Sequence, residues 1–153
     1  MSEMVGKLSI QNVRLKEWMI LLSDNFDVDD DSLGSYRKQG YRSCVGSKIC
    51  ELQVDGQTVY EHSFAYKVGL RFIDDADEEL HEDDVDAMLV MEATFESIYH
   101  SAEKIEDKAI SDFSAHNVGF NVWPFWRELV QTSSARLGLP ENISVPFYQS
   151  EDV

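Results

Sequence analysis

The feature that most constrains the fold is residues 59–73, where apolar and polar side chains alternate over 15 residues. Seven large side chains occupy every second position: Tyr60, His62, Phe64, Tyr66, Val68, Leu70 and Phe72. Because successive side chains of a β-strand point to opposite faces, this alternation predicts a long strand with one buried face. The rest of the chain must therefore supply partner strands and a layer that covers this face.

A first strand is predicted near the N-terminus. Residues 7–16 alternate between apolar and polar side chains, and the alternation changes phase between Ile10 and Val13. An extra residue in one strand produces such a change, so we expect a β-bulge there. The polar composition of residues 24–40 predicts a solvated connection to the next strand.

Two more segments have the pattern of strands. Residues 43–54 end at Asp55 and Gly56, a pair that favours the tight turn of a β-hairpin. Residues 87–99 place apolar side chains at every second position, with further apolar side chains between them near the start. We expect them to pair antiparallel with residues 59–73.

After residue 104 the apolar period changes from that of a strand to that of a helix. A short amphipathic helix is predicted by four residues: Ile105, Ala109, Ile110 and Phe113. Pro124 suits the first turn of a second helix, and Gly138 suits the cap after its end. Residues 116–125 contain Gly and Asn and are expected to connect the two helices. Strands followed by helices predict an α+β fold, an antiparallel sheet with helices on one face.

The charge and the length of the chain exclude several classes of protein. The 153 residues include 29 Asp and Glu against 13 Lys and Arg, a formal net charge of −16 at pH 7. Nucleic-acid binding needs clustered cations, and an anionic membrane surface would repel the chain. The apolar runs are too short to span a bilayer, and the first residues do not resemble a secretory signal. We expect a cytoplasmic protein with one domain over residues 1–153 and acidic loops near residues 24–40 and 74–86.

The chemically reactive side chains do not converge. The four histidines lack the spacing of metal ligands, and His62 is expected to pack in the sheet. Asp27 to Asp31 lack the Gly and Glu that a calcium loop requires. Cys44 and Cys50 are too far apart in one strand for a disulfide. The sequence therefore predicts a binding protein, not an enzyme, without cofactor or metal.

Apolar side chains exceed what one small domain readily buries. Residues 116–125, HNVGFNVWPF, are rich in them. Surplus apolar surface indicates oligomerisation or a groove for extended apolar peptides. The candidate residues for client binding or an oligomer interface are Phe120, Val122, Trp123, Phe125 and Trp126.

The order of these elements and the C-terminal residues resemble the SecB family of export chaperones. The resemblance is strongest over residues 121–147, NVWPFWRELVQTSSARLGLPENISVPF. The shared pattern describes the main helix: aromatic residues and Pro at its start, a charged pair within it, and Arg-x-Gly at its end. A Pro-rich segment follows the helix. The charged pair is Arg127 and Glu128, and the ending is Arg136 and Gly138.

The resemblance implies a SecB-like fold, a four-stranded antiparallel sheet with C-terminal helices on one face, and a homotetramer built as a dimer of dimers. It also implies a cytoplasmic, ATP-independent holdase for unfolded client proteins or preproteins, in protein export or translocation. An acidic surface would attract basic clients. Family members continue beyond the equivalent of Phe147 with a second helix and a tail that contacts the export motor SecA. This sequence ends at Val153, so contact with SecA stays open.

Two alternatives also stay open. The first is a SecB-like chaperone attached to a toxin-antitoxin system. The second is an acidic homo-oligomeric adaptor that binds one folded partner. The acidic residues 74–86 make the connection between two predicted strands longer than the hairpin typical of the family. A divergent chaperone and an adaptor are both compatible with this difference.

Overall fold

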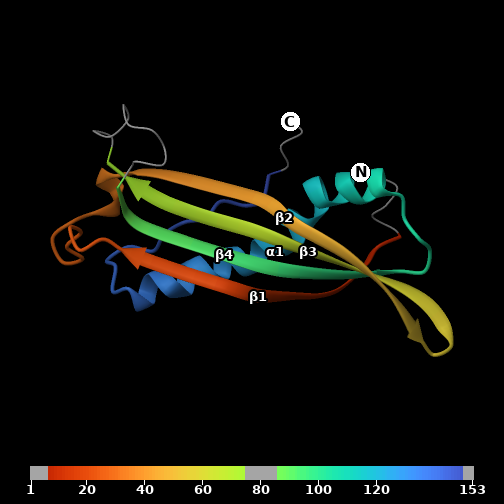
Figure 1. The fold of residues 1–153 in the computed structure, drawn as a ribbon. Helices are drawn as coiled ribbons and strands as arrows, with labels where there is room; N and C mark the ends of the chain where they lie inside the picture. The colour runs from red at the N-terminus through yellow and green to blue at the C-terminus, as the bar shows by residue number, and fades with distance from the viewer. Residues whose placement is uncertain (1–6, 75–85, 150–153) are drawn as a thin grey trace.

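Four long strands form one antiparallel sheet, and one long helix crosses one face of it (Figure 1). The computed structural model describes residues 7–74 and 86–149. The strands are β1 (Ser9–Leu22), β2 (Arg37–Val54), β3 (Gln57–Ile73) and β4 (Ala87–Ser101). The helix is α1 (Asp107–Arg136), and a short 3-10 helix, η2 (Leu33–Ser35), lies between β1 and β2. The strand order is β1-β4-β3-β2, so β1 and β2 are the edge strands.

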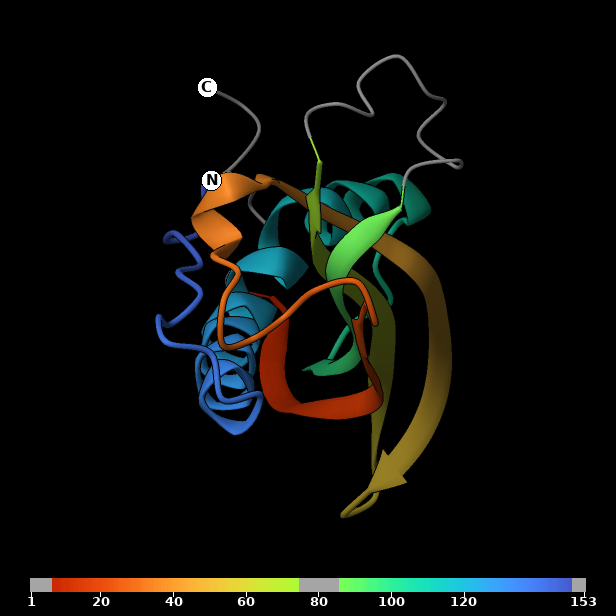
Figure 2. The same cartoon turned by 90° about the vertical axis from the view of Figure 1, so that its left-hand side faces the viewer.

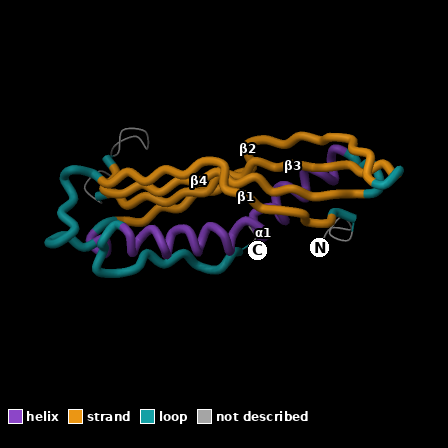
Figure 3. The backbone as a smooth tube through the Cα atoms, turned by 90° about the horizontal axis from the view of Figure 1, so that it is seen from below, coloured by secondary structure: helices purple, strands orange, loops and turns teal. Residues whose placement is uncertain are grey.

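The alternation of β3 produces the core, as predicted. Its even positions from Phe64 to Phe72 are buried. The register pairs Tyr66 with Phe95, which brings the apolar faces of β3 and β4 together in the predicted antiparallel pair. Four side chains of α1 close the core from the other side: Val118, Val122, Trp126 and Val130. Each large side chain buried in this layer contributes roughly 1.5–3 kcal/mol. Figure 3 shows the sheet and the helix as two layers.

β1 is longer than the sequence predicted, because two bulges restore the phase of its apolar residues. The register with β4 shifts between Ile10 and Asn12, where a bulge was expected, and again between Leu15 and Glu17. After the second shift, three further apolar side chains pack against the core: Trp18, Ile20 and Leu22. A strand predicted to end near residue 16 therefore continues to Leu22.

β2 begins at Arg37, inside the segment that was predicted to be a solvated connection. Most of its side chains are exposed at this edge of the sheet. Polar residues in an edge strand show no alternation, which is why the prediction failed there. The turn after β2 is as predicted, since Asp55 and Gly56 have φ of 51° and 78°. The second predicted acidic loop, residues 74–86, lies outside the described part of the chain except for its two end residues.

α1 is one continuous helix of 30 residues, so the prediction of two helices joined by residues 116–125 was wrong. Gly119 was one of the residues that predicted a break between two helices. In the structure, the absence of a side chain at this position allows close packing. A Cβ at this position would lie 2.5 Å from Tyr66 Oη and 2.9 Å from the ring of Tyr148. Tertiary contacts on both sides of Gly119 therefore outweigh its low helix propensity.

Two further residues of the expected connection are accommodated inside the helix. Asn121 Oδ1 accepts a hydrogen bond of 2.7 Å from Tyr99 Oη, and burial raises the pKa of Tyr99 to about 12. Pro124 cannot donate a main-chain hydrogen bond, which favours a bend of the helix. Figure 2 shows the C-terminal half of α1 nearly end-on and the N-terminal half from the side. The predicted cap is confirmed, because Gly138 follows the helix with a φ of 72°.

On the face of the sheet away from α1, a tyrosine packs over a glycine. Tyr41 of β2 and Gly69 of β3 are paired across the strands. A Cβ on Gly69 would lie 2.1 Å from Tyr41 Cζ, so the ring occupies the space of the missing side chain. Tyr41 Oη donates a hydrogen bond of 2.7 Å to Glu92 Oε1. Burial and, secondarily, this hydrogen bond raise the pKa of Tyr41.

We predict that Gly69→Ala destabilises the protein by about 1 kcal/mol, because it displaces the Tyr41 ring and breaks its bond to Glu92. With Tyr41→Ala already present, Gly69→Ala should be neutral or stabilising, since Ala is favoured over Gly inside a strand by roughly 0.5–1 kcal/mol. Urea denaturation of the four proteins measures both effects. The same sign of change in both backgrounds would contradict this contact.

Candidate binding groove

A groove of about 520 Å³ lies between the edge strand β2 and α1. It is lined by β2 near Lys38 and Arg42, by Trp123 and Trp126 of α1, and by the chain after the helix. The groove lies where α1 crosses β2 and β3, and the chain after the helix forms its remaining wall.

The chain's own C-terminal segment, residues 143–149, lies extended along this groove and forms one of its walls. Figure 2 shows it in blue, rising beside α1 toward the start of β2. Four side chains donate hydrogen bonds to its carbonyl oxygens: Lys38 to Ser144 (2.6 Å), Arg127 to Val145 (2.9 Å), Trp123 to Pro146 (2.6 Å) and Arg42 to Gln149 (2.5 Å). Carbonyl oxygens are common to all residues, so this arrangement recognises an extended chain with little regard to its sequence.

Aromatic rings and guanidinium groups form the walls of the groove. The Arg42 guanidinium lies 4.4 Å from the ring centroid of Tyr148 and 5.4 Å from that of Trp123. The Tyr148 ring also contacts the rings of Trp123 and Phe120, with centroid distances of 5.6 Å and 6.1 Å. Such cation–π contacts contribute roughly 0.5–1 kcal/mol each at exposed sites. The groove therefore combines apolar surface with cationic donors, in a protein whose net charge is −16.

The structure separates the five predicted site residues of α1. Val122 and Trp126 are core side chains, 0% and 2% exposed. Trp123 is half-buried and lines the groove, while Phe120 is 63% exposed and Phe125 is 48% exposed. At 3.6 residues per turn, Phe125 is rotated about 140° from Phe120 around the helix. Phe120 and Trp123 therefore share the groove side of α1, and Phe125 lies on the other flank.

Sequence reasoning missed Lys38, Arg42 and the C-terminal segment. Lys38 directly follows Arg37, and Arg42 comes four residues later in a polar stretch. Nothing in this spacing distinguishes them from solvated charges. Arg127 was noted only as part of a family pattern. The alternation of Ile143, Val145 and Phe147 was the available signal, since every second residue is apolar, as in an extended segment with one buried face.

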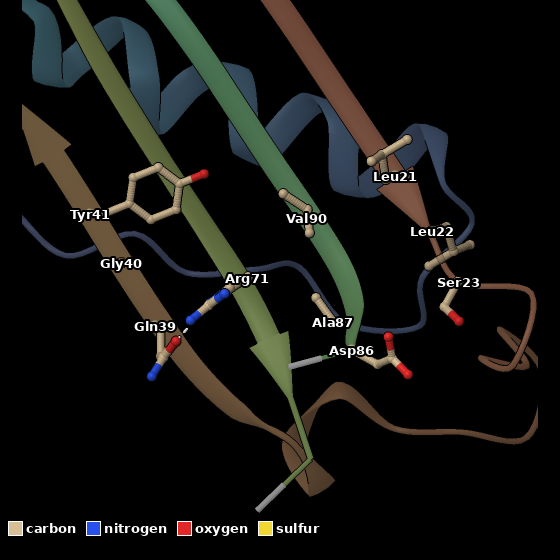
Figure 4. Close-up of a pocket in the computed structure, with 10 residues that line it drawn as sticks. All are labelled: Leu21, Leu22, Ser23, Gln39, Gly40, Tyr41, Arg71, Asp86, Ala87 and Val90. Atoms are coloured by element: carbon tan, nitrogen blue, oxygen red, sulfur yellow. Dashed lines mark hydrogen bonds between the residues drawn. The ribbon is translucent and has the colours of Figure 1, made fainter. Parts of the chain in front are cut away.

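A larger trough, of about 840 Å³, lies on the opposite face of the sheet (Figure 4). Figure 4 shows its side chains in front of the strands and α1 behind them. Arg71 in its wall donates a hydrogen bond of 2.7 Å to Gln39, and the Tyr41 hydroxyl bonds to Glu92. Its polar groups bind one another and do not converge on a common point, so we place the candidate site in the groove.

The described residues contain no group of three or more His, Cys, Asp or Glu side chains that could hold a metal ion. His62 is packed in the sheet, as expected: Nε2 lies 3.0 Å from Ser101 Oγ, and burial lowers the pKa of the imidazole. In the acidic turn, Asp27 and Asp31 bond main-chain N–H groups of the turn itself. In the part of the chain that the structure covers, no helix is long and apolar enough to cross a membrane.

The sheet order and the single long helix match the fold of a SecB-like chaperone. One solved structure that resembles it is the Mycobacterium tuberculosis Rv1957 SecB-like chaperone in complex with a ChAD peptide from Rv1956 HigA1 antitoxin. The match has a TM-score of 0.60 and covers 95% of this chain and 94% of that chain, with 11% sequence identity. No family model and no curated protein matches the sequence. The likeness confirms the predicted fold, with one C-terminal helix in place of several.

We predict that Arg42→Met loosens the end of the C-terminal segment. It removes a hydrogen bond to Gln149 and two ring contacts, and a loss of about 1.4 kcal/mol corresponds to a tenfold larger open population. Chymotrypsin should then cleave after Phe147 and Tyr148 about tenfold faster, because cleavage follows that population. Arg14→Met is the matched control, since Arg14 pairs with Glu96 at 3.4 Å in β1. Equal cleavage rates in both variants would contradict the role of Arg42.

Proposed function

We propose that this protein is an ATP-independent molecular chaperone, a holdase that binds unfolded polypeptide segments in the groove between β2 and α1. The observation that carries the proposal is the extended C-terminal segment along the groove, held through its carbonyl oxygens by Lys38, Arg42, Trp123 and Arg127. A site that already accommodates an extended chain through its main chain has the chemistry required for unfolded clients of varied sequence.

Apolar burial supplies the remaining affinity. Phe120 and Trp123 offer aromatic surface beside the groove, and burial of apolar surface contributes about 25 cal/mol per Å². Binding needs no covalent step and no nucleotide. It would limit aggregation by lowering the free concentration of exposed apolar segments.

The resemblance to SecB-like chaperones supports a homotetramer, arranged as a dimer of dimers. Exposed apolar side chains outside the groove are consistent with subunit contacts: Ile10, Leu15 and Phe125. Apolar patches on a protein surface commonly mark such contacts. Phe125 lies on the helix flank away from the groove, so an interface there would leave the groove open.

The cellular setting that we favour is a toxin-antitoxin system, because the similar Rv1957 chaperone was solved with a ChAD peptide from the HigA1 antitoxin. A groove that binds main-chain carbonyls would accept such a peptide as well as preproteins. Protein export, with transfer of preproteins to SecA, is the second setting. Both place the protein in the cytoplasm. An adaptor for one folded partner would not need a groove shaped for an extended chain.

We predict that the double substitution Phe120→Ala with Trp123→Ala weakens client binding at least fivefold, because it removes aromatic surface beside the groove. The matched control is Val122→Ala, one position away in the core, which should lower stability by about 2 kcal/mol but leave binding unchanged below the melting transition. Binding is measured by fluorescence anisotropy with labelled, reduced and carboxymethylated α-lactalbumin. Light scattering of a diluted denatured client measures suppression of aggregation. Unchanged suppression in the double variant would contradict the proposal.

We also predict a native mass near four times 17.5 kDa. Phe125→Glu should lower this mass, because a buried charge without a partner destabilises an interface. Phe120→Glu on the groove side should leave it unchanged. Analytical ultracentrifugation of the three proteins measures the effect, and a monomer for the unsubstituted chain would contradict the tetramer.

A further inference from the structure

We propose that the end of the chain, residues 146–149, is an internal competitor that forms one wall of the client groove, takes up its hydrogen-bond donors and must leave before a client binds. We call these residues the C-terminal strap. The inference rests on the proposed function, since it assigns a regulatory element to the same groove.

The C-terminal segment is attached in two different ways. Ile143 and Val145 are buried in the core, and the Ile143 N–H donates a hydrogen bond of 3.3 Å to Ser134 Oγ. Within the strap, by contrast, Phe147 is 77% exposed. The buried residues anchor the segment to the fold, and the strap after them lies on the surface of the groove.

The strap is held by side chains alone. Trp123 donates to the Pro146 carbonyl, Arg42 donates to the Gln149 carbonyl, and the Tyr148 hydroxyl donates to the His116 carbonyl at 3.1 Å. In residues 7–74 and 86–149, no hydrogen bond between main-chain groups joins the strap to β2 or α1. The bonds from Trp123 and Arg42 can be exchanged for equivalent bonds to another chain, because a client offers the same carbonyl groups.

The strap also covers the apolar groups that a client would use. The Tyr148 ring contacts Phe120 and Trp123, and the Phe147 ring lies 4.1 Å from the Arg127 guanidinium. A client and the strap therefore cannot contact Trp123 and Arg42 at the same time. The strap lowers the apparent affinity for clients by the fraction of molecules in which the groove is free.

The test compares the full chain with two shortened chains. One ends at Val145, which removes the strap and keeps both buried anchors, and the other ends at Gln149, which keeps the strap and removes the acidic end. The probe is fluorescein-labelled, reduced and carboxymethylated α-lactalbumin, and anisotropy gives the dissociation constant. The chain that ends at Val145 should bind about three- to tenfold more tightly, and the chain that ends at Gln149 should bind like the full chain.

A full-length variant, Phe147→Ser with Tyr148→Ser, makes the same test if the shortened chain fails to fold, as judged by its melting transition. The proposal is supported if either strap variant binds the probe more tightly than the full chain does. This includes the case in which binding by the full chain is too weak to measure. If the full chain binds and both strap variants bind equally or more weakly, the strap is part of the binding surface and the proposal is overturned. If no form of the chain binds the probe, the proposed chaperone function fails as well.

Discussion

The close contact between Gly119 of α1 and Tyr66 of β3 determines how the helix lies on the sheet. Because Gly119 has no side chain, the helix approaches the Tyr66 hydroxyl to a distance that no other residue would allow. The chain therefore stays helical where its own residues favour a break, and the following turns continue along the sheet. Those turns present Trp123 and Arg127 to the C-terminal segment in the groove. The groove is thus a consequence of core packing on the same face of the helix, because Gly119 and Trp123 are four residues apart.

The distribution of charge differs from what the net charge suggests. A protein with a formal charge of −16 places three of its cations, Lys38, Arg42 and Arg127, on the carbonyl oxygens of one extended segment. Cations bind carbonyl dipoles without requiring a particular side chain, and the guanidinium groups also stack on aromatic rings. The attraction of an acidic surface for basic clients stays a prediction, and the groove adds donors for main-chain oxygens and aromatic walls.

The strands were predictable because burial of one face of a strand produces an alternation that is visible in the sequence. The period-two alternation of residues 59–73, the phase change after Ile10 and the Asp55-Gly56 turn each have one local physical cause, and all three are present in the structure. The start of β2 and the continuity of α1 were not predictable, because each depends on a neighbour far away in the sequence. An edge strand has no buried face to generate alternation. A helix through Gly119, Asn121 and Pro124 is favoured only once Tyr66, Tyr99 and Tyr148 are in place.

The sequence alone determined that the chain forms an antiparallel sheet with one apolar face, that it carries surplus aromatic residues, and that it resembles SecB. Those properties depend on composition and on spacing along the chain. Only the tertiary structure decided which of the candidate residues are available, because Val122 and Trp126 are buried in the core, while Trp123 lines the groove and Phe120 is exposed beside Tyr148. The tertiary structure also places Lys38 and Arg42 next to residues 144–149, which come more than 100 positions later in the sequence. A side chain's role depends on what the fold places opposite it, and for these residues that partner is distant in the sequence.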